Sequence, residues 1–197
     1  MAIDLLYTNQ GGGGNWGAIP YAGYDVLCLA EGSVIKDGFT EVFNSRTQPA
    51  MSVQTNDRSG RVITGARDLD GNLIEVRPFV CFQVTRINVM VVFMHLKSGS
   101  VAYATQALEN AVAQYLKMMH GKTDIPTLWI GDYNRAAIEP LQIAFNDCNV
   151  LFKSGGVAKW SLDRAVITGS WNNVRIDTKE VSRSGDNQHV GIGVRFS

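Results

Sequence analysis

The stretch Thr127–Arg135 reads Thr-Leu-Trp-Ile-Gly-Asp-Tyr-Asn-Arg, and the other candidate elements of the chain can be placed around it. Its apolar residues 128–130 form the kind of run that fills a buried strand. Gly131 ends the run, and Asp132 and Asn134 follow two positions apart, so both side chains lie on one face of an extended segment. A carboxylate beside an amide suits a hard cation or a phosphate. The same residues also favour an ordinary polar turn, so this stretch alone leaves both interpretations open.

The composition is that of a globular protein without a strong charge preference. The chain has 197 residues, 45% of them hydrophobic, which predicts one α/β domain over residues 1–197. Its 18 basic and 18 acidic residues cancel, so no overall electrostatic field draws the protein to nucleic acid or anionic lipid. A net charge of zero does not exclude a local basic groove. The apolar run Ile3–Tyr7 leaves no room for a signal peptide. We therefore expect a cytosolic protein or a secreted one whose leader has been removed.

The cysteines do not have the spacing of a metal or disulfide framework. There are three of them, and none forms a Cys-x-x-Cys element. Cys28 and Cys81 stand inside apolar runs, which predicts buried thiols.

Runs of apolar residues between turn signals predict most of the strands. Asp70-Gly71-Asn72 predicts a hairpin turn between residues 61–65 and 73–76. From Gly32 to Ser59 the signals are weak, and we expect mainly loop there. The remaining predicted strands are Ile3–Tyr7, Asp25–Ala30, Phe79–Val84, Ile87–Met94, Ala165–Ile167 and Val190–Phe196.

Two further segments have the features of helices. Val101–Met119 carries apolar residues at helical spacing, and Gly121 follows it as a stop signal. Ala136–Asn146 is a shorter candidate with Pro140 near its start. Strands together with these helices predict the α/β class.

Glycines 12, 14 and 17 fit the dinucleotide-binding pattern G-x-G-x-x-G, and Glu31 follows at about the spacing of a ribose-binding carboxylate. That pattern requires a helix directly after the glycines. Residues 15–24 include Gly17, Pro20 and Gly23 and are too short and broken for such a helix. A dinucleotide-binding oxidoreductase is therefore the weaker alternative.

Polar side chains stand at the ends of several predicted strands. Each one alone is better explained as an ordinary turn or strand-end residue, and a lone histidine beside an apolar run is usually a core residue. Gathered at one sheet edge, acidic groups and two histidines suit metal-assisted phosphoryl chemistry, in which a cation neutralises the phosphate and imidazoles transfer protons. These residues are Asn9, Glu31, His95, Asp132, Asn134, Asp163 and His189.

In its motifs the chain resembles the endonuclease/exonuclease/phosphatase superfamily, which has the deoxyribonuclease-I-like fold. The similar segments occur in the family's order along essentially the whole chain. They are Thr8–Gly11 (W-N-x-x-G, with Thr8 for the tryptophan), Val26–Glu31 (the strand ending in Q-E, with Ala30 for the glutamine), Arg77-Pro78, Phe93–Ser98 (the histidine motif), Gly131–Asn134 (G-D-x-N) and Leu162-Asp163. Within the superfamily, Glu31–Ser33, Asn134-Arg135 and Leu162-Asp163 are most similar to the catalytic subunit of cytolethal distending toxins.

The resemblance implies a two-sheet β-sandwich of mixed strands flanked by helices. It implies a Mg²⁺-dependent phosphodiesterase, first of all a DNA endonuclease, with Mn²⁺ or Ca²⁺ as the alternative ions. A phosphoinositide phosphatase on the same fold is the second reading, and a catalytically impaired binding module is the third. DNA or a phosphoinositide is accordingly the expected partner.

The resemblance also implies a role for each candidate residue. Its metal ligands are Glu31 and Asn9, with Asp186 as a further candidate. Asp132 and Asn134 orient the attacking water and the phosphate, and Arg77 contacts phosphate. In the proton transfers, His95 is the general acid, and His189, oriented by Asp163, is the base or stabilises the developing charge.

One departure from the family lies near the C-terminus. The family ends in Ser-Asp-His, whereas here Gln188 precedes His189 and the nearest aspartate is Asp186. Either a local turn at Gly185 brings Asp186 to the metal, or Gln188 occupies the metal position with weakened charge. The first alternative is preferred, because an amide is a poor replacement for a carboxylate on a hard cation.

Overall fold

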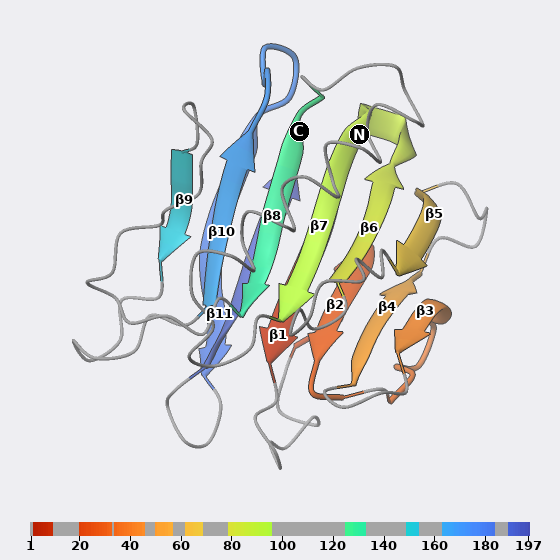
Figure 1. The fold of residues 1–197 in the computed structure, drawn as a ribbon. Coiled ribbons are helices and arrows are strands. Elements are labelled where there is room, and N and C mark those ends of the chain that lie inside the picture. The colour runs from red at the N-terminus through yellow and green to blue at the C-terminus, as the bar shows by residue number, and fades with distance from the viewer. Residues whose placement is uncertain are drawn as a thin grey trace, which may run out of the picture.

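The computed structural model describes residues 2–9, 20–32, 34–45, 50–56, 62–68, 79–95, 125–132, 149–153, 163–183 and 189–197. Within them, the strands form two six-stranded sheets that pack face to face as a sandwich (Figure 1). The fold class that the sequence predicts, a two-sheet sandwich of mixed strands, is confirmed.

The first sheet is built from both ends of the chain, in the order β11-β12-β1-β2-β4-β3. Its strands are β1 (Ile3–Asn9), β2 (Val26–Ala30), β3 (Thr40–Ser45), β4 (Met51–Thr55), β11 (Ile176–Arg183) and β12 (Val190–Phe196). The second sheet uses the middle of the chain, in the order β5-β6-β7-β8-β10-β9. Its strands are β5 (Ile63–Asp68), β6 (Phe79–Val84), β7 (Val89–His95), β8 (Thr127–Asp132), β9 (Asn149–Lys153) and β10 (Asp163–Thr168).

Among the described strands, each sheet contains one parallel pair. β1 runs parallel to β2, and β7 runs parallel to β8, while the other pairings are antiparallel. Figure 1 shows the arrowheads of β1, β2, β7 and β8 at the same end of the sandwich. The carboxyl ends of four strands from two sheets are therefore gathered at one edge.

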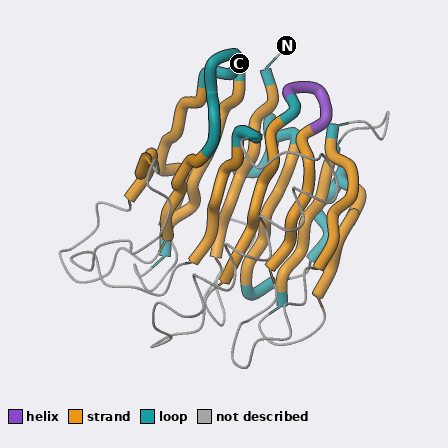
Figure 2. The backbone as a smooth tube through the Cα atoms, turned by 45° about the horizontal axis from the view of Figure 1, so that its top comes forward, coloured by secondary structure: helices purple, strands orange, loops and turns teal. Residues whose placement is uncertain are grey.

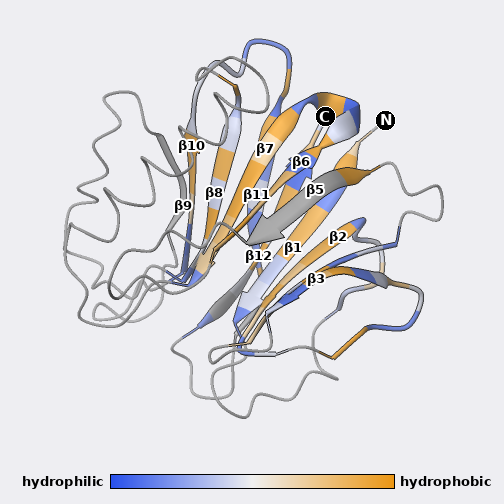
Figure 3. Cartoon of the chain, turned by 45° about the vertical axis from the view of Figure 1, so that its right-hand side comes forward, coloured by the Kyte–Doolittle hydropathy of each residue, from blue (hydrophilic) through white to orange (hydrophobic). Residues whose placement is uncertain are grey.

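The core lies between the sheets and follows the alternation of residues along each strand. Ile3, Leu5 and Tyr7 of β1 face Val91 and Phe93 of β7 within one buried cluster. Figure 3 shows hydrophobic residues along β6, β7 and β8. Burial of each large apolar side chain stabilises the fold by roughly 1.5–3 kcal/mol, so this cluster holds the two sheets together.

The two described cysteines are buried, as predicted. Cys28 lies on β2 and Cys81 on β6, and both are fully inaccessible. Burial raises the pKa of each thiol well above its ordinary value, so neither forms the thiolate that metal binding or nucleophilic attack needs.

The predicted strands that lie within the described residues are confirmed with small changes of boundary, but the expectation for residues between Gly32 and Ser59 differs from the structure. There the expectation of loop is wrong, because β3 and β4 complete one edge of the first sheet. β4 is buried throughout although it contains Ser52 and Gln54. The Gln54 amide donates to Val34 O at 2.9 Å and to Ser52 Oγ at 3.1 Å, so its polar atoms are satisfied inside the protein.

The strand expected from Ile87 begins two residues later. Thr85–Ile87 form a short 3-10 helix, η2, and Asn88 adopts a left-handed conformation with φ of 54° before β7 starts. β5 pairs with β6, whereas residues 73–76, where the other arm of the expected hairpin lies, are outside the described residues. The predicted helices over 101–119 and 136–146 also lie outside them and stay predictions.

Figure 2 shows both chain ends and η2 at one end of the sandwich, away from the carboxyl ends of β1, β2, β7 and β8. In the part of the chain that the structure describes, no helix is long and apolar enough to span a membrane.

Candidate active site

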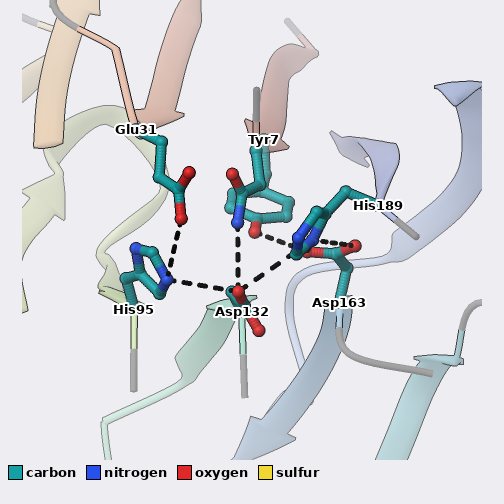
Figure 4. A network of polar contacts seen from close by, with 7 residues as sticks. Tyr7, Glu31, His95, Asp132, Asp163 and His189 are labelled. Atoms are coloured by element: carbon teal, nitrogen blue, oxygen red, sulfur yellow. Dashed lines mark hydrogen bonds and ion pairs between the residues drawn. The ribbon is translucent and has the colours of Figure 1, made fainter. Parts of the chain in front are cut away.

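The strand ends bring the described candidate residues together at one end of the sandwich (Figure 4). The first sheet contributes residues from β1, from the turn after β2 and from the position before β12, and the second contributes residues from β7, β8 and β10. These residues are Asn9, Glu31 and His189 from the first sheet, and His95, Asp132 and Asp163 from the second. The sequence thus predicts their proximity correctly, while their roles stay predictions.

Strand register sets three of these residues side by side. His95 at the end of β7 pairs with Asp132 at the end of β8, and Asp132 pairs with Asp163 at the start of β10. All three are at most 2% exposed. Their spacing is set by backbone hydrogen bonds, so the row is preorganised for chemistry.

Asp132 is at the centre of the polar network. Its Oδ2 accepts a hydrogen bond from Asn9 Nδ2 at 3.0 Å and lies 3.2 Å from His95 Nε2. His95 Nε2 is also 3.5 Å from Glu31 Oε1. A proton on Nε2 of His95 would suit both contacts, because ionised carboxylates only accept hydrogen bonds.

Glu31 reaches this network through an uncommon backbone conformation. Its φ is 57°, in the left-handed region that non-glycine residues seldom adopt. Its N–H donates to Ala50 O at 2.7 Å, which anchors the turn at the end of β2. The carboxylate is 28% exposed and contacts the buried His95. Such local strain is often kept where it positions a functional group, and here it turns an acidic side chain toward the site.

His189 and Asp163 form a second acid–imidazole pair. His189 Nδ1 lies 3.2 Å from Asp163 Oδ2 and 3.3 Å from Oδ1, and 3.9 Å from Asp132 Oδ2. The carboxylate therefore selects the tautomer with hydrogen on Nδ1, which leaves Nε2 as the basic nitrogen. Burial raises the pKa of Asp163, and the hydrogen bond from His189 opposes that rise.

Tyr7 belongs to the same network, and the sequence analysis did not select it. Its hydroxyl donates to Asp163 Oδ1 at 2.6 Å. Burial, followed by the charge of Asp163, raises its pKa well above the ordinary value, so the phenol keeps its proton at neutral pH. Its position two residues before Asn9 places it on the same face of the strand, but the sequence does not distinguish it from a tyrosine of the core.

Gly131 lets β8 approach β7 directly beside the site. Its φ is 152°, and it pairs with Met94 in the parallel ladder. A Cβ at this position would overlap the carbonyl oxygen of Met94. The glycine of the Gly-Asp motif is thus required by the close packing that holds His95 against Asp132.

The donor set includes groups that suit a hard cation. Asn9 pairs with Ala30 across β1 and β2, so Asn9 and Glu31 stand at adjacent strand ends and offer amide and carboxylate oxygens. These residues therefore fit the ion that the resemblance implies.

A second group, Asp132, Asp163 and His189, also has ligand atoms within 4.8 Å of one another. Its compactness is explained by the hydrogen bonds between His189 and Asp163. The group is therefore a second place at which the described residues could hold a metal ion.

Three candidate residues lie outside the described residues: Arg77, Asn134 and Asp186. Their proposed roles stay predictions, as does the choice between Asp186 and Gln188. The glycines of the dinucleotide pattern lie outside as well, but Glu31, its expected ribose ligand, contacts His95 instead.

The fold with this arrangement is that of the endonuclease/exonuclease/phosphatase proteins. An endonuclease/exonuclease/phosphatase family protein from Bacteroides thetaiotaomicron superposes with a TM-score of 0.64 over 100% of this chain and 95% of that chain, at 11% identity. The deoxyribonuclease-I-like fold that the motifs imply is confirmed.

Other solved structures with this fold come from proteins of different names. TDP2 of D. rerio, humanized by 14 mutations, has a TM-score of 0.64 and 13% identity, covering 100% of this chain and 99% of that chain. Another D. rerio TDP2 structure is complexed with a single-strand DNA product. The cytolethal distending toxin of Haemophilus ducreyi has a TM-score of 0.62 and 12% identity, over 98% of this chain and 97% of that chain.

A mannosyl-6-phosphatase of B. thetaiotaomicron also shares the fold, with a TM-score of 0.62, 11% identity and 99% coverage of both chains. No protein-family model matches the chain, and no curated protein matches its sequence.

Proposed function

We propose that this protein is a metal-dependent phosphoester hydrolase whose substrate is the phosphodiester backbone of DNA. The observation that carries the proposal is the pairing of each imidazole with a buried carboxylate: His95 with Asp132 on the adjacent strand, and His189 with Asp163 of the facing sheet. Such pairs supply a general acid and a general base to one reaction centre. The DNA product in a D. rerio TDP2 structure of the same fold supports the choice of substrate.

In the reaction, a water molecule attacks phosphorus and gives its proton to Nε2 of His189. Asp163 holds the ring by Nδ1 and stabilises the positive charge that the ring acquires. The bond from phosphorus to the leaving oxygen breaks, and that oxygen takes a proton from His95. Asp132 and Asn134 orient the water and the phosphate, and Arg77 contacts a phosphate oxygen.

Asn9, Glu31 and Asp186 would hold the divalent cation, Mg²⁺ in the first place and Mn²⁺ or Ca²⁺ as alternatives. When bound, the ion neutralises negative charge on the phosphate. The proposed ion is supported by the acidic side chains of Glu31, Asp132 and Asp163, which gather in the site where an anionic substrate would enter.

Nicking of supercoiled plasmid DNA tests the proposal. We expect nicking with Mg²⁺, loss of nicking in EDTA and recovery when Mg²⁺ is added in excess. Asp132→Asn should abolish it, whereas Asp177→Asn should not, because Asp177 is an exposed aspartate of β11 paired with Arg175. Full nicking in EDTA would refute metal dependence.

A phosphomonoesterase is the second candidate, and the shared fold of mannosyl-6-phosphatase favours it. The same preparation should be tested on a phosphoinositide in vesicles and on mannose 6-phosphate, with release of inorganic phosphate as the readout. Release of inorganic phosphate from either substrate without plasmid nicking would show that the protein is a phosphatase and not a nuclease. Release from the phosphoinositide would identify a phosphoinositide phosphatase. DNA binding without hydrolysis of any substrate would indicate a catalytically impaired binding module.

A further inference from the structure

We propose that Tyr7 is a positioning residue: its hydroxyl fixes the carboxylate of Asp163 and, through it, the ring of His189. The effect of Tyr7 on catalysis rests on the proposed function. The effect of Tyr7 on the position of the His189 ring is independent of that function and can be measured without a substrate.

The three side chains form one continuous chain of hydrogen bonds. The Tyr7 hydroxyl donates to Asp163 Oδ1 at 2.6 Å, and both oxygens of Asp163 lie within 3.3 Å of His189 Nδ1. Tyr7 and Asp163 are both 0% exposed and come from different sheets. Bulk water therefore cannot take the place of the hydroxyl if it is removed, and Asp163 would lose one of the groups that set its rotation.

The tyrosine is itself held in place by the core. Its ring packs edge-on against Phe93 of β7, with ring centroids 5.9 Å apart and an interplanar angle of 64°. The pleat of β1 directs Tyr7 and Asn9 to the same side, where Asn9 donates to Asp132. β1 thus holds the two carboxylates of the facing sheet with two side chains of fixed spacing.

A buried tyrosine that only fills the core would also need a hydrogen-bond acceptor, so the two roles must be separated by measurement. The positioning role predicts that the state of the His189 ring changes when the hydroxyl is removed. The core-filling role predicts a loss of stability alone.

Long-range proton–nitrogen NMR of the histidine rings makes this comparison directly. The chain has three histidines, so His189 can be assigned with one His189→Gln variant. In the wild type we expect the tautomer with hydrogen on Nδ1. Tyr7→Phe should shift the ring nitrogens of His189 toward a mixture of tautomers, and Tyr24→Phe should leave them unchanged.

Tyr24 is a matched control because it is 8% exposed and packs on Leu6, Leu27 and Leu29, in a cluster separate from the core between the sheets. Ring nitrogens of His189 that are identical in the wild type and in Tyr7→Phe would overturn the proposal. If Tyr7→Phe does not fold, the wild type supplies the test: we expect a downfield, slowly exchanging Tyr7 hydroxyl proton together with hydrogen on Nδ1 of His189, and a rapidly exchanging hydroxyl proton or another His189 tautomer overturns the proposal.

Kinetics give the second readout. Tyr7→Phe should lower kcat roughly tenfold, as expected for the loss of one charge-assisted hydrogen bond, with KM changed by less than about twofold. In an Asp163→Ala background, Tyr7→Phe should not lower kcat any further, because the carboxylate through which Tyr7 acts is absent. An equal loss in both backgrounds would refute action through Asp163. If the wild type hydrolyses none of the phosphoesters, the proposed function fails, and the ring spectra still test the position of His189.

Discussion

Asp132 and Asp163 are direct cross-strand partners on β8 and β10, so two buried carboxyl groups face each other in one antiparallel ladder. Like charges placed directly opposite destabilise a sheet. Here the pair is surrounded by described groups that donate to it or contact it. These are Asn9 and His95 at Asp132, and Tyr7 and His189 at Asp163. These neighbours therefore contribute to the stability of the carboxyl pair.

Replacement of either histidine should separate catalysis from stability. We expect His95→Ala and His189→Ala each to lower turnover by roughly a hundredfold or more, because general acid–base catalysis typically contributes that much. The folded fraction and the specific activity should be measured on the same preparation. If His95 is only a core residue, His95→Ala will lower the melting temperature while the specific activity of the folded fraction stays intact.

Gly131→Ala should destabilise the protein strongly. A methyl group there would overlap the backbone oxygen of Met94, and relief requires β7 and β8 to separate. We expect a loss of about 3 kcal/mol or more in the free energy of unfolding by urea.

Gly38→Ala is the control for that change. Gly38 also has positive φ, at 83°, but nothing lies within 4 Å of its added Cβ. Gly38→Ala should lower the free energy of unfolding by only about 1 kcal/mol, because the left-handed backbone is its sole source of strain. Equal losses at the two positions would contradict the close approach of β7 and β8.

Tyr7 should make the protein sensitive to alkali. Because burial and the charge of Asp163 raise the pKa of Tyr7 in the folded state, the phenol stabilises the fold fully below about pH 10, its ordinary pKa. Above that pH only the unfolded chain readily ionises, so the contribution is lost as the pH rises.

Urea unfolding of the wild type and of Tyr7→Phe at pH 8 and pH 11 measures this effect. The wild type should lose more stability than the variant between the two pH values, since phenylalanine cannot ionise. Parallel losses in the two proteins would show that Tyr7 is not protected from ionisation.

The segment before His189 can be tested by metal titration of the nicking rate. If Asp186 is the metal ligand, Asp186→Asn should weaken the apparent Mg²⁺ affinity markedly, and Gln188→Asp should have little effect. If Gln188 stands at the metal, Gln188→Asp should raise activity and Asp186→Asn should be nearly silent. Unchanged titrations in both variants would exclude both residues from the metal site.

Strands with continuous apolar runs were predictable, because such a run indicates a strand that is buried on both faces of its sheet. β2, β6, β7 and β8 are of this kind. β4 was missed because its buried Ser52 and Gln54 are satisfied by hydrogen bonds that tertiary structure alone provides. β9 was also missed, and so was β11, whose described side chains are at least partly exposed and carry little apolar signal.

The site was predictable to the extent that strand ends meet at a sheet edge. Asp132 and His95 follow apolar runs, so their proximity could be inferred from the order of strands. The left-handed conformation of Glu31 could not be inferred, since no local signal in the sequence marks it. The bond from Tyr7 to Asp163 was hidden too, because a tyrosine within an apolar run is indistinguishable from core until the facing sheet is known.

The division of the site between two sheets has a consequence during synthesis on the ribosome. The second sheet is made from residues 63–168 in one continuous stretch, whereas the first also needs β11 and β12, which are translated afterwards. His189 directly precedes β12, and β12 pairs along β1, between β1 and β11. In the proposed reaction, a nascent chain that already carries Asn9, His95, Asp132 and Asp163 lacks its base until the segment before β12 emerges, so the proposed hydrolysis begins only after β12 has been translated.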